Sequence, residues 1–460
     1  MATGMPSKRR GTRDQRESPR PLVANPELIG LTYPGKREVS DILSTPSSDP
    51  HLVWQGTETQ HPNLLFAGDN GGILAHLLAD KQVAGKVRLI YIDPPYSTQT
   101  DFHSRDLTPA YTDDLRGADF VEYLRIRLVL LQKLLADNGS IYVHLDSKMV
   151  CHLKIVMDEV FGPENFRNII TRKKCNPKNF TKKQYGNVSD YILFYSKTGD
   201  CLWNRPVEAW TAQRAKEYQY TEEGTGRKFM KVPVHAPGVR YGETGKPWRG
   251  MLPPPGKHWQ YVPSILDEMD ARGEIFWSSS GNPRRKVYLD ENPGLAVQDI
   301  WMDFKDAHNQ NVCITGYPTE KNPDLLRRII GASTAPGDLV LDCFSGSGTT
   351  LAVASELDRR WIGIDSGLEA ISTTLRRLTG GLERMGDFTQ HRLIKTDERQ
   401  KQLSLAAVDE FFEQTAVSRD HKPVIDFQLL CDPLLKREVE RIVEGWSGRH
   451  FGVVRRVQSD

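Results

Sequence analysis

The sequence has no long apolar stretch and almost no net charge. No run approaches the roughly 18 apolar residues of a membrane-spanning helix. Residues 1–20 are basic but are not followed by the apolar segment of a secretory signal. We therefore expect neither a membrane span nor a signal peptide. With 61 Lys and Arg against 59 Asp and Glu, the net charge of +2 does not by itself indicate a nucleic-acid partner.

Cysteines are few, and their spacing matches no known metal-binding or disulfide pattern. The six cysteines are scattered along the chain and form no Cys-x-x-Cys pair. This pattern argues against a disulfide framework and against a zinc site, so we expect no metal. Isolated cysteines are typical of a reducing compartment, and we expect the protein to act in the cytoplasm.

The chain is long enough for two or three structural units, and its composition changes along its length. Residues 1–50 are rich in Pro, Ser, Arg and Asp and show little periodicity, so we expect most of them to be disordered. Strand and helix patterns alternate through 51–198 and again through 301–375, whereas 199–300 is loop-rich. Residues 376–460 are predicted to form a mainly helical extension, with one or two short strands, that packs on the protein or docks a partner.

Alternating strands and helices predict an α/β fold, with a doubly wound and mostly parallel sheet covered on both faces. The two alternating regions should fold side by side, so that turns at the carboxyl ends of adjacent strands meet where open α/β sheets bind ligands. The apolar patterns predict strands at 63–70, 86–92, 140–146, 190–197, 339–344 and 361–365, and helices at 72–82, 118–136, 148–161, 322–332 and from 349 onward.

The strand at 86–92 ends in the tetrapeptide Asp93-Pro94-Pro95-Tyr96. A strand-ending turn would explain the prolines, since they cannot donate to a sheet. The tetrapeptide also suits a chemical role, because an amine on a heteroaromatic ring is a poor nucleophile. Asp93 and the rigid carbonyl between the two prolines would accept both of its hydrogens and free its lone pair. Tyr96 would offer a face on which the base stacks, so we predict that all four residues are catalytic.

A glycine-rich turn follows the strand at 339–344 and opens a helix. Gly346 and Gly348 would let the backbone approach a ligand closely, with free N–H groups at the helix start. No lysine follows these glycines, which excludes a P-loop, and Leu351 stands where a dinucleotide site has its third glycine. The turn therefore favours a ligand that has a ribose but no pyrophosphate. Asp365 would accept hydrogen bonds from the ribose hydroxyls. A plain tight turn is the alternative.

The two motifs together resemble the S-adenosylmethionine-dependent DNA amino-methyltransferases of the permuted beta class, over about residues 60–375. In that family a DPPY tetrapeptide precedes an FxGxG turn, as it does in this sequence. Residues 317–330 resemble a cofactor-flanking motif usually written TQKP, from which Glu320 and Asn322 depart. The strand at 189–197 resembles one that lines the target-base pocket.

The resemblance implies a circularly permuted Rossmann-like sheet that binds S-adenosylmethionine. Asp69 and Asn70 lie in a loop similar to the one whose acidic residue contacts the cofactor adenine, and Thr319 and Lys321 keep the flanking motif. The cofactor site implied by the resemblance comprises Asp69, Asn70, Thr319, Lys321, Asp342, Phe344, Ser345, Gly346, Ser347, Gly348, Thr349 and Asp365.

The resemblance also implies a substrate. In the family an aspartate at the first DPPY position goes mostly with adenine, which points to methylation of its N6 amine in double-stranded DNA after base flipping. Cytosine-N4 methylation is the alternative, and a non-catalytic DNA-binding protein on the same fold is a third reading. Residues 256–291 resemble a segment of site-specific methyltransferases and type III-like modification subunits. A restriction or defence-system subunit and a second copy of the chain are therefore the expected protein partners.

Two groups of basic residues are predicted to contact DNA. The run 171–183 carries six Lys or Arg and no acid, as a loop that follows phosphates would, although such runs are often only solvated surface. Residues 199–300 are predicted to form an inserted target-recognition domain that reads bases. The predicted contacts are Arg172, Lys173, Lys174, Lys178, Lys182, Lys183, Arg249, Arg284, Arg285 and Lys286.

Two further predictions concern histidine and tryptophan. His144 would be either a proton acceptor near the site or, more simply, a core histidine held by hydrogen bonds. Of Trp248, Trp259 and Trp277, we expect two to form a small local core.

Overall fold

The computed structural model of the 460-residue chain divides into two compact units. One comprises residues 203–300, close to the insert predicted at 199–300, and the other is formed by the residues before and after it. The structure describes residues 29–95, 101–103, 109–112, 117–176, 183–208, 216–291, 294–306, 313–315, 317, 320–380, 383–384 and 423–450.

The larger unit is built on a 10-stranded sheet with the order β1-β22-β2-β20-β19-β3-β6-β8-β7-β17 in the described residues. The strands from β22 to β6 run parallel. Strand β1 pairs antiparallel with β22 on one side, and on the other side β8 pairs antiparallel with both β6 and β7. The strands are β1 (His51–Gln55), β2 (Asn63–Ala67), β3 (Val87–Ile92), β6 (Leu135–Leu145), β7 (Phe166–Lys173), β8 (Ser189–Ser196), β17 (Ile300–Trp301), β19 (Leu339–Asp342), β20 (Arg360–Asp365) and β22 (Phe427–Cys431).

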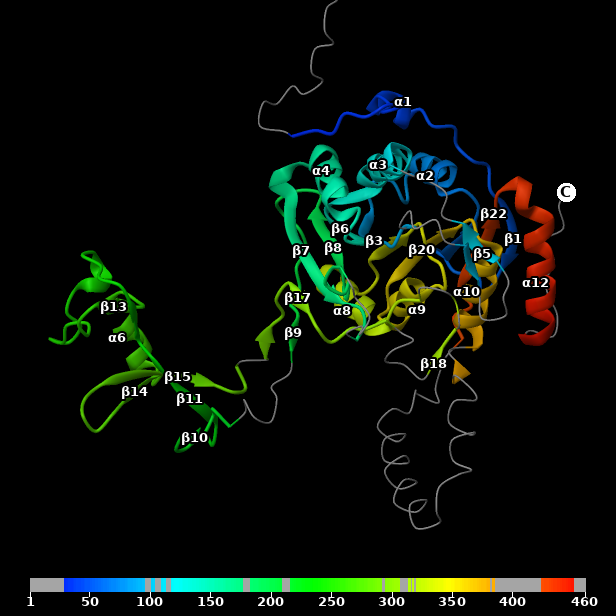
Figure 1. Cartoon of the computed structure of the whole chain (residues 1–460). Coiled ribbons are helices and arrows are strands. Elements are labelled where there is room, and N and C mark those ends of the chain that lie inside the picture. The colour runs from blue at the N-terminus through cyan, green and yellow to red at the C-terminus, as the bar shows by residue number, and fades with distance from the viewer. Residues whose placement is uncertain are drawn as a thin grey trace, which may run out of the picture. The chain divides into compact units, whose positions relative to one another are not determined.

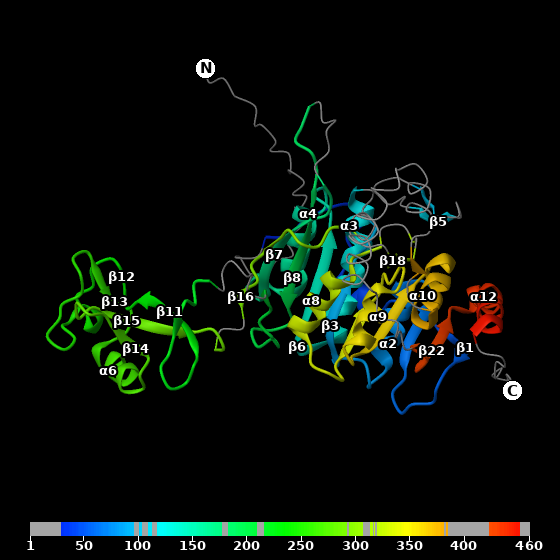
Figure 2. The same cartoon turned by 90° about the horizontal axis from the view of Figure 1, so that it is seen from below.

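Helices cover both faces of this sheet, which confirms the predicted doubly wound α/β fold (Figures 1 and 2). The helices α2 (Asn70–Ala79), α3 (Gly117–Leu134) and α4 (Val150–Phe161) lie on one face, and α8 (Pro323–Ser333), α9 (Thr349–Glu356) and α10 (Leu368–Gly380) lie on the other. In α3, apolar residues at helical spacing such as Leu124, Leu128 and Leu131 are buried against the sheet. None of the helices that the structure describes is long and apolar enough to cross a bilayer.

Strands β3 and β19 are direct neighbours, although one precedes the insert and the other follows it. They run parallel, with Leu89 opposite Val340 and Ile90 opposite Leu341. Their carboxyl ends therefore lie at the same edge of the sheet, where β3 leads to Asp93 and β19 leads to the glycine-rich turn. This confirms the prediction that the two alternating regions fold side by side.

The described tail completes the far side of the sheet. Strand β22 lies between β1 and β2. Helix α12 (Lys436–His450) follows, and the ring of its Trp446 packs edge-on against Trp54 of β1, with 5.0 Å between ring centroids. Trp446 Nε1 donates to Thr379 Oγ1 at 3.0 Å. The described part of the tail is thus a structural component of the larger unit.

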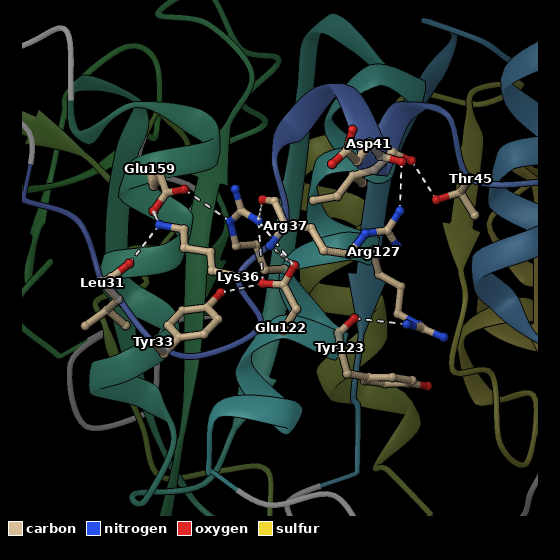
Figure 3. A network of polar contacts seen from close by, with 12 residues as sticks. Leu31, Tyr33, Lys36, Arg37, Asp41, Thr45, Glu122, Tyr123, Arg127 and Glu159 are labelled. Carbon is tan, nitrogen blue, oxygen red and sulfur yellow. Dashed lines mark hydrogen bonds and ion pairs between the residues drawn. The ribbon is translucent and has the colours of Figure 1, made fainter. Parts of the chain in front are cut away.

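Residues 29–50, part of the region expected to be mostly disordered, include Tyr33 and Lys36, which pack on α3 and α4 (Figure 3). The rest of that region, residues 1–28, lies outside the described residues. Tyr33 Oη donates to Glu122 Oε2 at 2.6 Å, and Lys36 Nζ donates to Glu159 Oε2 at 2.7 Å. These contacts join a polar segment to distant helices, which local composition does not reveal. A short helix, α1 (Val39–Leu43), lies within the segment.

The unit of residues 203–300 has its own sheet and core. Its 4-stranded sheet has the order β10-β11-β15-β14, and α6 (Pro263–Ala271) and Ile275 of β14 contribute to a core with Trp248 and Trp259. Trp248 and Trp259 are buried, whereas Trp277 is partly exposed and stacks on Trp248. Two of the three tryptophans therefore form the local core, as predicted. The strands are β10 (Tyr220–Thr221), β11 (Lys228–Pro233), β14 (Ile275–Trp277) and β15 (Pro283–Tyr288).

Short strands and turns connect these elements. Within the described residues the paired strands are β4 (Asp101–His103) with β5 (Pro109–Thr112), β9 (Val207–Glu208) with β16 (Leu295–Ala296), β12 (His235–Pro237) with β13 (Lys257–Trp259), and β18 (Cys313–Ile314) with β21 (Glu383–Arg384). Single 3-10 turns occupy Pro163–Asn165, Glu243–Gly245 and Pro433–Leu435.

Candidate active site

The turn after β3 places Asp93 at the carboxyl edge of the central sheet. Its Oδ2 forms an ion pair with Lys321 Nζ, and the two side chains are 17% and 10% exposed. Pro94 is buried and Pro95 is partly exposed. The structure thus joins a residue predicted to be catalytic to a residue predicted to flank the cofactor.

Asp342, the last residue of β19, braces the glycine-rich turn. Its Oδ1 accepts from the backbone N–H of Phe344 at 3.0 Å, and its Oδ2 accepts from Thr350 Oγ1 at 2.6 Å. Burial raises the pKa of Asp342 to about 7, although both hydrogen bonds lower it, and the charge of Asp93 adds to the rise. A carboxyl group that titrates near neutrality would change its charge when a cation binds beside it.

Asp365, the last residue of β20, fixes the backbone of the same turn. Its carboxylate accepts from the N–H groups of Gly346 and Gly367, both at 2.8 Å, and burial raises its pKa. Gly346 and Gly348 have φ values of +50° and +72°, a region that glycine adopts without strain. A Cβ at Gly348 would also lie 2.8 Å from the side chain of Thr374. Both glycines are therefore required by the backbone of the turn.

The hydroxyl groups of the turn are buried, and one has no partner. Ser347 Oγ lies 3.2 Å from Thr349 Oγ1. Ser345 Oγ is buried without a hydrogen-bond partner in the part of the chain that the structure describes. A Cβ at Gly346 would lie 3.5 Å from the ring of Tyr317. An unpaired buried hydroxyl beside the partly exposed backbone of Gly346 would suit a bound polar ligand.

The loop between β2 and α2 is tied to the end of β19. Asn70 is buried, donates to the carbonyl of Cys343 at 2.7 Å and accepts from Arg127 Nε at 2.5 Å. Asp69 caps α2, pairs with Arg127 at 2.9 Å and remains 67% exposed. Arg127 was not predicted as a site residue, and its guanidinium lies 3.4 Å from the ring centroid of Tyr123. An arginine on an amphipathic helix gives no sequence signal for such a role.

The two departures from the flanking motif each have a structural partner. Glu320 forms a buried ion pair with Arg377 of α10, and its Oε2 accepts from the N–H and the hydroxyl of Thr315 at 2.8 and 2.7 Å. Burial lowers the pKa of Arg377, while the charge and hydrogen bond of Glu320 raise it. Asn322 caps α8 by accepting from the N–H of Asp324 at 2.9 Å.

A set of buried side chains, here called the buried polar network, crosses β3, β6, β8 and β7. Tyr91, two residues before the catalytic turn, has its Oη 2.8 Å from His144 Nδ1. His144 Nε2 lies 3.0 Å from Asp190 Oδ2, and Arg172 Nη1 lies 2.9 Å from the same oxygen. Arg172 Nη2 pairs with Asp306 at 2.8 Å. His144 is therefore a buried histidine held by polar contacts, as the simpler prediction had it.

Arg172 cannot follow DNA phosphates as the sequence predicted. Its side chain is 0% exposed, and its Nε donates to the carbonyl of Phe304 at 2.7 Å. Two carboxylates and a carbonyl replace the water that burial removes from the guanidinium. Lys173 and Lys174 are partly exposed and Lys183 is exposed, so these three lysines are accessible.

Four predicted site residues, Tyr96, Lys178, Lys182 and Thr319, lie outside the described residues. Within the described residues, no group of three or more His, Cys, Asp or Glu side chains is arranged to hold a metal ion.

The predicted base-reading residues of the insert differ in whether their side chains already pair with other protein groups. Arg249 pairs with two aspartates at 2.9 and 2.5 Å, and Lys286 pairs with Glu222 at 2.7 Å. Arg285 donates to a tyrosine hydroxyl at 3.0 Å. Arg284 is exposed on β15.

Comparison with known proteins gives consistent matches. The sequence model of a family described as N6/N4 DNA methylase matches residues 87–376. Type II methyltransferase M.EcaI of Enterobacter cloacae is 45% identical over 405 residues, which cover 86% of this chain and 87% of that protein. The probable type III restriction-modification enzyme HindVI Mod subunit of Haemophilus influenzae is 27% identical over 429 residues, and the match spans 76% of this chain but only 56% of that subunit. The crystal structure of the M1.HpyAVI–SAM complex aligns with a TM-score of 0.38 and 18% identity, over 68% of this chain and 98% of that one.

Proposed function

The chain belongs to the N6/N4 family of DNA methylases, which use S-adenosylmethionine, and on this premise we propose that it methylates the N6 amine of adenine in duplex DNA. The observation that carries the proposal is the parallel pairing of β3 with β19, which brings Asp93 and the glycine-rich turn to one edge of the sheet. An aspartate at the first position of the tetrapeptide favours adenine over cytosine as the target.

The residues at this edge fit the cofactor. S-adenosylmethionine carries a sulfonium and an amine and supplies an electrophilic methyl group when bound. Ser345 offers a buried hydroxyl that lacks a partner within the described residues. Asp342 and Asp365 offer carboxyl groups, the first for a cationic group and the second for ribose hydroxyls. Asp69, which is largely exposed, would contact the adenine ring.

Asp93 acts on the target amine as a hydrogen-bond acceptor. The carboxylate and the adjacent proline carbonyl hold the two N–H bonds, and the prolines keep both acceptors rigid. As the amine becomes tetrahedral its hydrogens become more acidic, so these contacts strengthen in the transition state and lower the barrier. Tyr96 would stack on the flipped base.

For DNA contact, the face of the β10-β11-β15-β14 sheet that carries the exposed Arg284 is the best candidate surface. Directly paired residues share a face, so Phe276 lies with Arg284 and Lys231 lies with Lys286. Lys231 Nζ lies 3.5 Å from the ring centroid of Tyr220 and 3.4 Å from that of Phe276. Aromatic rings interleaved with basic groups are typical of surfaces that bind nucleic acids. The tryptophan core lies on the opposite face, with Ile275.

The biological setting that we propose is a restriction–modification system in the cytoplasm of a bacterial cell. The names of the relatives, a type II methyltransferase and a type III Mod subunit, support this setting. A restriction subunit or a second copy of the chain would be the protein partner.

The test is methyl transfer by Asp93→Asn, with Asp200→Asn at an exposed carboxylate as the control. Transfer from labelled S-adenosylmethionine to duplex DNA should fall by about two orders of magnitude in Asp93→Asn, by analogy with the loss of a preorganised polar contact. Calorimetric cofactor binding should change little. Mass spectrometry of the digested DNA should show N6-methyladenine. The appearance of N4-methylcytosine instead, or a wild-type rate in Asp93→Asn, would contradict the proposal.

A further inference from the structure

The proposed acceptor of the target amine is already engaged. Asp93 Oδ2 holds the ammonium of Lys321, and both side chains are largely buried. A charge-assisted hydrogen bond is stronger than one from a neutral amine. A flipped base would therefore not displace the ammonium unless a second group received its charge.

A second carboxylate with an uncommitted oxygen lies on β8, which is separated from β3 only by β6 in the sheet. Asp190 is 6% exposed, and its Oδ2 is shared by His144 and Arg172. Its Oδ1 is buried and has no hydrogen-bond partner in the described part of the chain. Burial raises the pKa of Asp190, but His144, Arg172 and Lys321 together hold it well below its ordinary value. Asp190 is therefore ionised and lies within the electrostatic influence of Lys321.

Asp190 is held by several partners, whereas Lys321 has a long side chain with many rotamers. The buried polar network anchors the carboxylate through Arg172, which is itself held by Asp306 and the carbonyl of Phe304. Lys321 adjoins the cap residue of α8, so its backbone is constrained while its four-carbon side chain can rotate. A compact ammonium on a flexible stem is suited to exchange between acceptors.

We propose that Lys321 is a positioning residue that exchanges between two carboxylates. It holds Asp93 while the pocket contains no base, and it turns to Oδ1 of Asp190 when the target amine takes its place on Asp93. The inference rests on the proposed function, since it concerns the same amine. The exchange moves no proton and keeps the ammonium paired in both states. Asp93 is thereby held in position before the base arrives, without blocking the base afterwards.

The test is a double-mutant cycle between Asp190→Asn and Lys321→Met. Asp190→Asn keeps the shape of the side chain but removes the charge that would receive the ammonium. We expect it to lower the single-turnover rate of methyl transfer about tenfold, with DNA and cofactor affinities nearly unchanged. In the Lys321→Met background the same substitution should have no further effect, because the group through which Asp190 acts is gone.

Asp306→Asn is the matched control. It removes the other carboxylate that pairs with Arg172 but leaves the proposed acceptor, so the rate should remain close to that of the wild type. If Asp190→Asn lowers the rate by the same factor in both backgrounds, or if Asp306→Asn lowers it equally, Asp190 has only a structural role and the proposal is wrong.

A second comparison applies if thermal melting shows that Asp190→Asn does not fold. Lys321→Arg keeps a charge that can reach either carboxylate, so it should retain clearly more activity than Lys321→Met, and equal rates would overturn the exchange. A wild-type protein that transfers no methyl group to DNA would refute the proposed function itself, and the exchange with it.

Discussion

Asp342 gives the stability of the protein a specific dependence on pH. Burial raises its pKa from the ordinary 3.8 to about 7. The folded state then binds the proton more tightly than the unfolded chain, so stability is lost as the pH rises from about 4 to about 7. At about 1.4 kcal/mol for each pH unit, the ionised carboxyl costs the folded state about 4 kcal/mol above that window.

Asp342→Asn isolates this effect. The amide has nearly the same shape, can still accept from the N–H of Phe344, and does not titrate. The free energy of unfolding, measured by urea denaturation, should therefore rise in the variant relative to the wild type by about 3 kcal/mol between pH 5 and pH 8. Other titrating groups are common to both proteins and cancel in the difference.

The control is Asp200→Asn, at an exposed carboxylate. Its free energy of unfolding should stay close to that of the wild type, because the substituted side chain is exposed. The reasoning would be refuted if the difference in the free energy of unfolding between Asp342→Asn and the wild type stayed constant from pH 5 to pH 8. That result would mean that the carboxyl group is not poised near neutrality in the folded protein.

Three further variants test other parts of the structure. Gly348→Ala forces a left-handed φ of +72° on alanine and brings its Cβ within 2.8 Å of Thr374, so unfolding should cost about 2 kcal/mol less by urea titration. Tyr33→Phe removes the 2.6 Å hydrogen bond to Glu122, and a loss of about 1 kcal/mol by the same measurement is expected. No loss would mean that this hydrogen bond does not stabilise the fold. Replacing Lys173, Lys174 and Lys183 by neutral residues should weaken binding to all DNA sequences equally. The slope of log affinity against log salt concentration should fall by up to about one for each phosphate contact that is lost.

The elements of the central sheet could be predicted because their signals are local. Apolar runs that end in Asp93 or in the turn at Gly346 identify strands and their carboxyl ends, and the alternation with helices predicts their common edge. The pairing of β3 with β19 follows from these two patterns.

The polar contacts that support the site could not be predicted in the same way. The ion pairs of Arg172 with Asp190, and of Arg377 with Glu320, join elements far apart in sequence. Arg172 is chemically similar to its neighbour Lys173, and only the inward direction of its side chain on β7 separates the two. Partners of this kind depend on the tertiary arrangement, which no local pattern in the sequence encodes.

The order of the strands has a consequence for how the protein is made. Strand β22 (Phe427–Cys431) separates β1 from β2, so β1 (His51–Gln55) has no place in the sheet until the tail is present. During translation the parallel strands β2, β20, β19, β3 and β6 can assemble first, while β1 must wait until β22 has left the ribosome. Pairing over such a separation closes slowly. A prematurely terminated product would leave an edge of β2 exposed, which makes truncated chains candidates for aggregation and degradation.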